Sequence, residues 1–103
     1  RSTTSIGSTT GEIAMQVTVR RKYWDLRFEE LDEVRGLCDP PDSIGKTIRI
    51  DSRLTGEEQL EVICHEVGHA SFWMIDEESI EEFGRDIAKI LWRLGYRRIA
   101  DGG

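Results

Sequence analysis

Two histidines lie four positions apart in the segment His65-Glu66-Val67-Gly68-His69, and a glutamate directly follows the first of them. On an α-helix, residues i and i+4 lie one above the other, so the two imidazoles would share a face and could hold one metal ion between them. Glu66 would lie beside that face, where its carboxylate could take a proton from a water molecule at the metal. These residue types at this spacing predict a metal site that activates water for hydrolysis.

The pattern H-E-x-x-H fixes only three positions, so a surface helix with two solvated histidines is the alternative explanation. Three observations favour the metal site. The motif lies in a segment with helical periodicity, the chain has no other histidine, and the flanking residues are apolar. Val62 and Trp73 would lie near the histidine side of the helix and give the site a hydrophobic wall. We therefore expect one Zn²⁺ ion per chain, bound by His65 and His69.

A catalytic zinc ion needs a third protein ligand and one position for water. No third histidine exists, so this ligand must be a carboxylate or, less favourably, Cys38. If the chain reverses direction near residues 75–77, positions 81–87 would face the histidines. The acids at these positions are Glu81, Glu82 and Asp86.

The elements that must position these residues begin with strands. Alternating apolar and polar residues predict a strand over 12–21 and another over 46–51. The aromatic segment 23–28 could extend the first strand, form a second one, or begin a short helix with residues 29–34. Residues 35–43 contain two prolines with flanking aspartates and are expected to form a loop.

Two helices follow. Helical periodicity extends from about residue 57 to 75, with Leu60, Ile63, Val67, Ala70 and Met74 along one stripe, and a second amphipathic segment ends at Gly95. Thr55 and Glu58 have the spacing of a capping box, and Asp76 can cap the second helix. The short connection favours an antiparallel pair. The apolar stripe expected on the second helix consists of Ile80, Phe83, Ile87, Ile90, Leu91 and Leu94.

These elements predict a small α+β domain, in which a sheet of two to four strands packs on an antiparallel helix pair that carries H-E-x-x-H. The domain would span residues 12–99. Residues 1–11 are rich in Ser, Thr and Gly and are expected to be disordered, and residues 100–103 would form a short tail.

The composition of the 103 residues narrows the function further. A net charge of -6 disfavours binding to nucleic acid. No apolar run approaches the ~20 residues that cross a bilayer, and no signal peptide is recognised. Two cysteines are too few for a disulfide framework. We expect a cytoplasmic protein that acts on a peptide or protein, with no nucleic-acid or membrane partner, in an oligomeric state that the sequence leaves open.

The motif and the acids that follow it resemble the gluzincins, the thermolysin-like zinc peptidases. In those enzymes a glutamate on a later helix is the third ligand, and an aspartate four residues further on hydrogen-bonds a metal-binding histidine. Glu82 and Asp86 have this spacing. The resemblance implies that Glu82 is the third ligand and that Asp86 orients a histidine, with Glu81 and then Glu78 as alternatives to Glu82.

Residues 46–95 also resemble the minimal metallopeptidase domains of bacteria and phages in the ImmA/IrrE and SprT-like groups. The resemblance implies a zincin-type metallopeptidase that hydrolyses peptide bonds, with Glu66 as the general base. A strand at the edge of the sheet, expected at residues 47–51, could bind the peptide by strand addition. The alternative is a non-catalytic, zinc-stabilised module that binds another protein. Glu66 favours catalysis, because a structural zinc site has no use for a base.

Residues 38–42, with the sequence Cys-Asp-Pro-Pro-Asp, resemble the cysteine switch of matrix metallopeptidases. There a thiolate from a pro-segment blocks the zinc ion. A rigid loop with a packed cysteine is the interpretation that we favour for Cys38.

Overall fold

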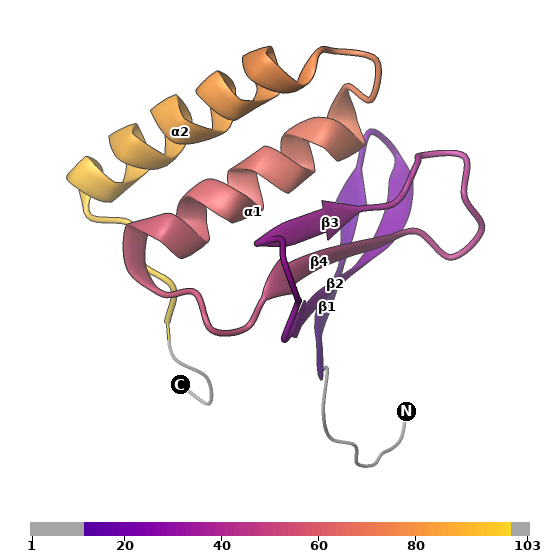
Figure 1. Ribbon diagram of the computed structural model, residues 1–103, viewed down its shortest axis with the longest axis horizontal. Coiled ribbons are helices and arrows are strands. Elements are labelled where there is room, and N and C mark those ends of the chain that lie inside the picture. Colours follow the sequence, from indigo (N-terminus) through magenta and orange to yellow (C-terminus); the bar gives the residue numbers. More distant parts are fainter. Residues whose placement is uncertain (1–11, 100–103) are drawn as a thin grey trace.

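The computed structural model describes residues 12–99, and the segments expected to be disordered (1–11) and to form a tail (100–103) lie outside the described residues. Helix α1 lies across one face of a four-stranded sheet, and helix α2 packs on α1 (Figure 1). This is the small α+β fold that the sequence predicts. Its elements are β1 (Glu12–Val19), β2 (Lys22–Glu29), β3 (Gly36–Cys38), β4 (Thr47–Asp51), α1 (Gly56–Ser71) and α2 (Glu77–Leu94).

The sheet has the strand order β1-β2-β4-β3. A two-residue turn joins β1 to β2, and its residues Arg20 and Arg21 have φ angles of 50° and 71°, as the tight turns that match strand twist require. Strand β2 pairs with β4 in parallel, and β4 pairs with β3 antiparallel. The expectation that residues 47–51 form an edge strand is therefore wrong. β4 lies inside the sheet because β3 forms within the segment 35–43, which was expected to be a loop.

The core lies between the sheet and α1. Trp24 of β2 and Ile48 and Ile50 of β4 are at most 1% exposed, and they pack with Val62 and Ala70 of α1. The aromatic segment 23–28, which the sequence left ambiguous, lies within strand β2. Because side chains alternate along a strand, every second residue faces one side of the sheet, and Trp24 faces this core.

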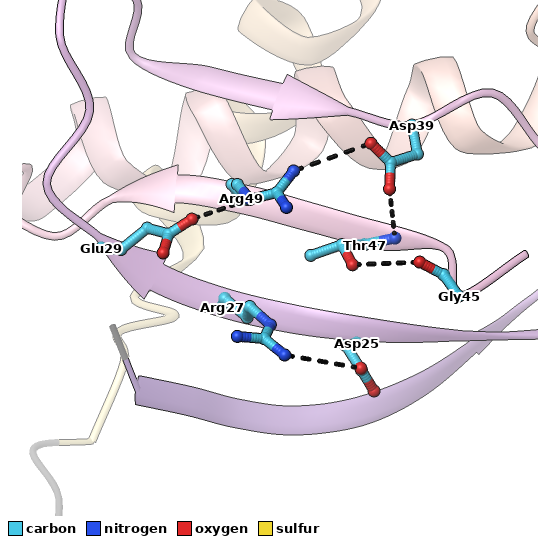
Figure 2. A network of polar contacts seen from close by, with 7 residues as sticks. All are labelled: Asp25, Arg27, Glu29, Asp39, Gly45, Thr47 and Arg49. Atoms are coloured by element: carbon cyan, nitrogen blue, oxygen red, sulfur yellow. Dashed lines mark hydrogen bonds and ion pairs between the residues drawn. The ribbon is translucent and has the colours of Figure 1, made fainter. Parts of the chain in front are cut away.

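The other face of the sheet carries charged side chains in place of a second layer. Figure 2 shows Arg49 of β4 between Glu29 of β2, at 2.8 Å, and Asp39, at 3.6 Å. Asp39 also accepts a hydrogen bond of 3.1 Å from the backbone N–H of Thr47. An antiparallel or mixed sheet can face water on one side when that side is polar, so both helices lie on the opposite side.

Helix α1 begins where the sequence predicts, but without the expected capping box, and it ends earlier than expected. Thr55 occupies the N-cap position but makes no side-chain cap hydrogen bond, and Glu58 accepts a 3.0 Å hydrogen bond from Arg35 instead. The helix ends at Ser71, whose carbonyl accepts a hydrogen bond from Arg20 at 3.0 Å. Residues 72–75 form an exposed loop. Met74, expected on the buried stripe, is 90% exposed there.

Helix α2 begins and ends where the sequence predicts. The Asp76 carboxylate accepts a 2.9 Å hydrogen bond from the Ser79 N–H, which holds the pKa of Asp76 below its usual range, and Gly95 ends the helix with φ 99°. Within the described chain α2 packs on α1 and on no strand, so part of its expected apolar stripe remains exposed. The exposed members are Phe83, Ile90 and Leu94.

Two glycines allow the helices to approach closely. A Cβ atom on Gly84 of α2 would lie 3.0 Å from the backbone N of His65 and 3.1 Å from its Cα. A Cβ atom on Gly68 of α1 would lie 3.3 Å from the Ile80 side chain. The contact at Gly84 sets α2 directly against the turn of α1 that carries the first histidine.

We expect Gly84→Ala to destabilise the protein by about 1 kcal/mol, the middle of the roughly 0–2 kcal/mol left when the helix-propensity gain is subtracted from the overpacking cost. Overpacking against a backbone typically costs about 1–3 kcal/mol, whereas alanine gains roughly 1 kcal/mol over glycine in helix propensity. Urea unfolding measures the difference. Gly68→Ala is the matched control, because its new methyl group meets only a side chain and its stability should change little. A midpoint for Gly84→Ala at or above that of the wild type would contradict the close approach.

Candidate metal centre

His65 and His69 lie on successive turns of α1 and face the start of α2. Their Nε2 atoms are 3.1 Å apart. Glu77, the first residue of α2, reaches both rings: its Oε2 lies 3.1 Å from the Nε2 of His65, and its Oε1 lies 2.9 Å from the Nε2 of His69. Three side chains from two helices thus bring possible metal-binding atoms within 4.8 Å of one another.

This donor set fits a zinc ion. Two imidazoles and one carboxylate form a known ligand set of catalytic zinc, and tetrahedral bonds of about 2.0–2.2 Å place neighbouring ligand atoms about 3.3–3.6 Å apart. The separations of 2.9–3.1 Å between these side chains are shorter, so small outward shifts of the side chains would give this spacing. The histidine side chains are 19% and 17% exposed and that of Glu77 is 68% exposed. The side chains could therefore hold an ion whose remaining position faces solvent.

The structure does not bring Glu82 and Asp86 to the histidines. Successive helical residues are about 100° apart, so Glu82 lies about 140° and Asp86 about 180° around α2 from Glu77. Both residues are exposed on the face turned away from α1. Glu81 lines a cavity beside His65 but does not belong to the metal-binding group, and neither does Glu78. The geometry thus favours Glu77 over the glutamates considered from the sequence.

The sequence contains a signal that identifies Glu77. It precedes Ile80 by three positions and Gly84 by seven, so it continues the face of α2 that packs on α1. Glu82 and Asp86 do not lie on that face of α2. If the histidines bind a metal ion together with a residue of α2, that residue has to lie on the face that meets α1, which favours Glu77 over Glu82 and Asp86.

Glu66 lies beside the cluster and is only 7% exposed. A Cβ atom on Gly36 of β3 would lie 2.8 Å from its Oε2, so the carboxylate rests against the strand where no side chain intervenes. Burial, and then the charge of Glu77, raise the pKa of Glu66 to about 7. A carboxylate with such a pKa can both accept and return a proton near neutral pH, as a general base must.

Cys38, at the end of β3, lines a groove together with His65, His69 and Glu66. Burial, the charge of Glu66 and then that of Asp39 raise the pKa of its thiol to about 12. The thiol donates a hydrogen bond of 3.4 Å to the carbonyl of Asp39. Metal binding and nucleophilic attack both need the thiolate, so this environment fits a packed structural cysteine rather than a switch.

The histidines, Glu66 and Glu77 line a groove of about 290 Å³ between β3 and the helix pair. A larger cavity of about 630 Å³ lies at the other end of the pair, around Gly56 and Trp92, and its lining is mostly apolar. We take the smaller groove as the functional site. Among the described residues it combines a set of metal-binding atoms with a buried acid, and the larger cavity has neither.

Neither of the described helices is both long enough and apolar enough to cross a membrane. Comparisons with models of protein families, with curated proteins and with solved structures give no match for this chain. Its function therefore has to be inferred from the site itself.

Proposed function

We propose that this protein is a zinc-dependent metallopeptidase of the zincin type. The proposal rests on one observation: His65, His69 and Glu77 converge on one point, with the buried carboxylate of Glu66 beside them. These three residues would hold one Zn²⁺ ion per chain. The ion would lower the pKa of a water molecule and polarise the carbonyl group of a peptide bond.

Glu66 would act as the general base. Its carboxylate takes a proton from the attacking water and gives it to the leaving amine, which is the role its position on α1 and its raised pKa suit. Gly36 positions this carboxylate, because any side chain there would collide with it. Burial keeps bulk water away from the acid and so strengthens its interactions with the reacting groups.

The substrate would be a peptide or protein segment in extended form. Strand β3 lies at the edge of the sheet and lines the groove, so its free edge can pair with an added strand. Strand β3 thus takes the place of residues 47–51, which were expected to pair with the peptide. A peptide along β3 would pass over Glu66 and the histidines.

A second candidate function follows from the contact between the helices. Glu77 connects the start of α2 to α1, and α2 packs on no other described element. A metal ion at this point would stabilise the helix pair with or without catalysis. The alternative is thus a zinc-stabilised module that binds a partner protein, and one zinc per chain without cleavage of any peptide would support it.

We place the protein in the cytoplasm. Cys38 and Cys64 are both free and partly buried, and burial raises the pKa of both thiols. Free, unreactive thiols suit a reducing compartment.

Removal of the metal tests the proposed function. We expect elemental analysis to find one zinc per chain, and a chelator to abolish cleavage of a library of unstructured peptides until zinc is restored. At a free zinc concentration 100-fold above Kd, loss of the ion should also cost about 2.7 kcal/mol of stability. A His65→Ala/His69→Ala double variant is the control and should bind no zinc. Cleavage that survives chelation, or a wild-type chain that binds no zinc, would contradict the proposal.

A further inference from the structure

The metal-binding groove continues into a second cavity. The two spaces, of about 290 Å³ and 320 Å³, share Gly36, His65, Glu66 and Glu77 along their common border. Helix α1 forms the floor, and β3 and the start of α2 form the walls. The candidate site therefore lies at the middle of one extended groove, which has two different ends.

One end is apolar. Trp73, just after α1, lines it together with Cys38 of β3 and remains 42% exposed. The ring of Trp73 meets that of His69 edge-to-face, with centroids 6.4 Å apart. The loop that carries Trp73 has further exposed apolar residues, which are Phe72, Met74 and Ile75. Exposed apolar surface of this extent is characteristic of binding sites.

The other end is acidic. Glu33, Glu61 and Glu81 line it together with the shared acids. Its one basic residue, Arg35, is paired with Glu58 at 3.0 Å. Arg85 approaches Glu81 to 3.6 Å at the surface, where such pairs are weak. Glu33 and Glu61 have no ion-pair partner within residues 12–99, so this end attracts cations.

Glu66, between the two ends, is only 7% exposed as a residue, and it lines both cavities. An occupant of the groove that supplies N–H groups could donate hydrogen bonds to this carboxylate. The backbone amides of an extended peptide are such groups.

We infer that the groove selects peptides with a large apolar residue on one side of the bond to be cut and a lysine or arginine on the other. The inference rests on the proposed function. The structure also predicts the direction in which the peptide binds, because β3 runs from the acidic end of the groove at Gly36 to the apolar end at Cys38. Antiparallel pairing is the more stable arrangement, so the apolar residue precedes the cut bond and the basic residue follows it.

Four peptides in an alanine and serine background test the inference on the zinc-loaded wild type, with Leu-Lys, Leu-Glu, Ser-Lys or Lys-Leu at the centre. We expect kcat/KM for Leu-Lys to exceed that for each of the others by at least about tenfold, because like charges and unfilled apolar surface disfavour them. Equal rates for all four peptides would overturn the selectivity, and faster cleavage of Lys-Leu would overturn the direction.

Reversing the charge of one residue in the acidic end of the groove tests whether the groove causes the selectivity. Glu61→Lys should shift the preference from Leu-Lys to Leu-Glu. Glu82→Lys makes the same change of charge on the outward face of α2 and should leave the wild-type preference in place. Retention of the Leu-Lys preference by Glu61→Lys would refute the acidic subsite.

Failure of the proposed function would look different. If the wild-type protein with zinc cleaves neither the peptide library nor any of the four peptides, the proposed peptidase function fails, and binding of the four peptides is then measured by fluorescence anisotropy. Tighter binding of Leu-Lys than of Leu-Glu, lost in Glu61→Lys, would still support the groove as a peptide site. Equal binding would overturn it.

Discussion

Replacement of Glu66 by glutamine is expected to lower kcat/KM for peptide hydrolysis by about 10²–10⁴-fold, the usual contribution of general acid–base catalysis. Glutamine has nearly the shape of glutamate, so it fits the space against Gly36 and β3. It cannot take a proton from water at any accessible pH. The variant should still bind one zinc, because Glu66 is not among the three converging metal-binding residues.

The pH profile makes this test specific. In the wild type a general base has to be ionised, so activity should fall as pH decreases through its pKa, and Glu66→Gln should lack this dependence. Glu61→Gln removes another carboxylate from the same helix and serves as the control, with a much smaller loss for a peptide without basic residues. Activity of Glu66→Gln within tenfold of the wild type, with zinc bound, would eliminate the proposed base.

Replacement of Glu77 by glutamine is expected to weaken zinc binding by more than 100-fold. Loss of a residue that only orients a ligand typically costs 10–100-fold, and a direct ligand should cost more. Glu77 approaches both imidazoles within 3.1 Å, and no other acid of α2 does so in the described structure. Competition with a chromophoric chelator measures the affinity.

Glu82→Gln is the matched control on the same helix. It removes the same charge from the face turned away from α1, so its zinc affinity should equal that of the wild type. If Glu82→Gln loses zinc and Glu77→Gln does not, the assignment drawn from the gluzincin resemblance is correct and the one drawn from the structure is wrong. Equal affinity in all three proteins would exclude both Glu77 and Glu82 as the carboxylate ligand.

The periodicity of apolar residues in the sequence was sufficient to predict most of the helices and strands. The alternation around Ile48 and Ile50 predicts β4, and the caps at Asp76 and Gly95 mark both ends of α2. Strand β3 has only three residues, Gly-Leu-Cys, which is too few for a pattern to emerge. Its existence depends on pairing with β4, a contact that no local sequence signal reveals.

The candidate site was predicted in part. The motif itself identifies His65, Glu66 and His69, and the structure places them on one helix as the chemistry requires. The third carboxylate was assigned from the expected reversal of the chain and from the gluzincin resemblance, and the acid-rich start of α2 offers several residues at plausible spacings. The helix face that meets α1 decides among them, and that face is marked by Gly84 and Ala88 more clearly than by the larger apolar residues.

The position of the metal-binding atoms and the burial of the base depend on different parts of the chain. His65, His69 and Glu77 lie close together in sequence within one helical hairpin, a local structure that forms early in folding because its ends need little entropy to meet. Glu66 acquires its burial from Gly36, and β3 requires the slower assembly of a sheet with a parallel pair. If the proposed function holds, a newly synthesised chain would bind its metal before Glu66 is buried against β3. During that interval it would not yet cleave peptides, including other unfolded copies of itself.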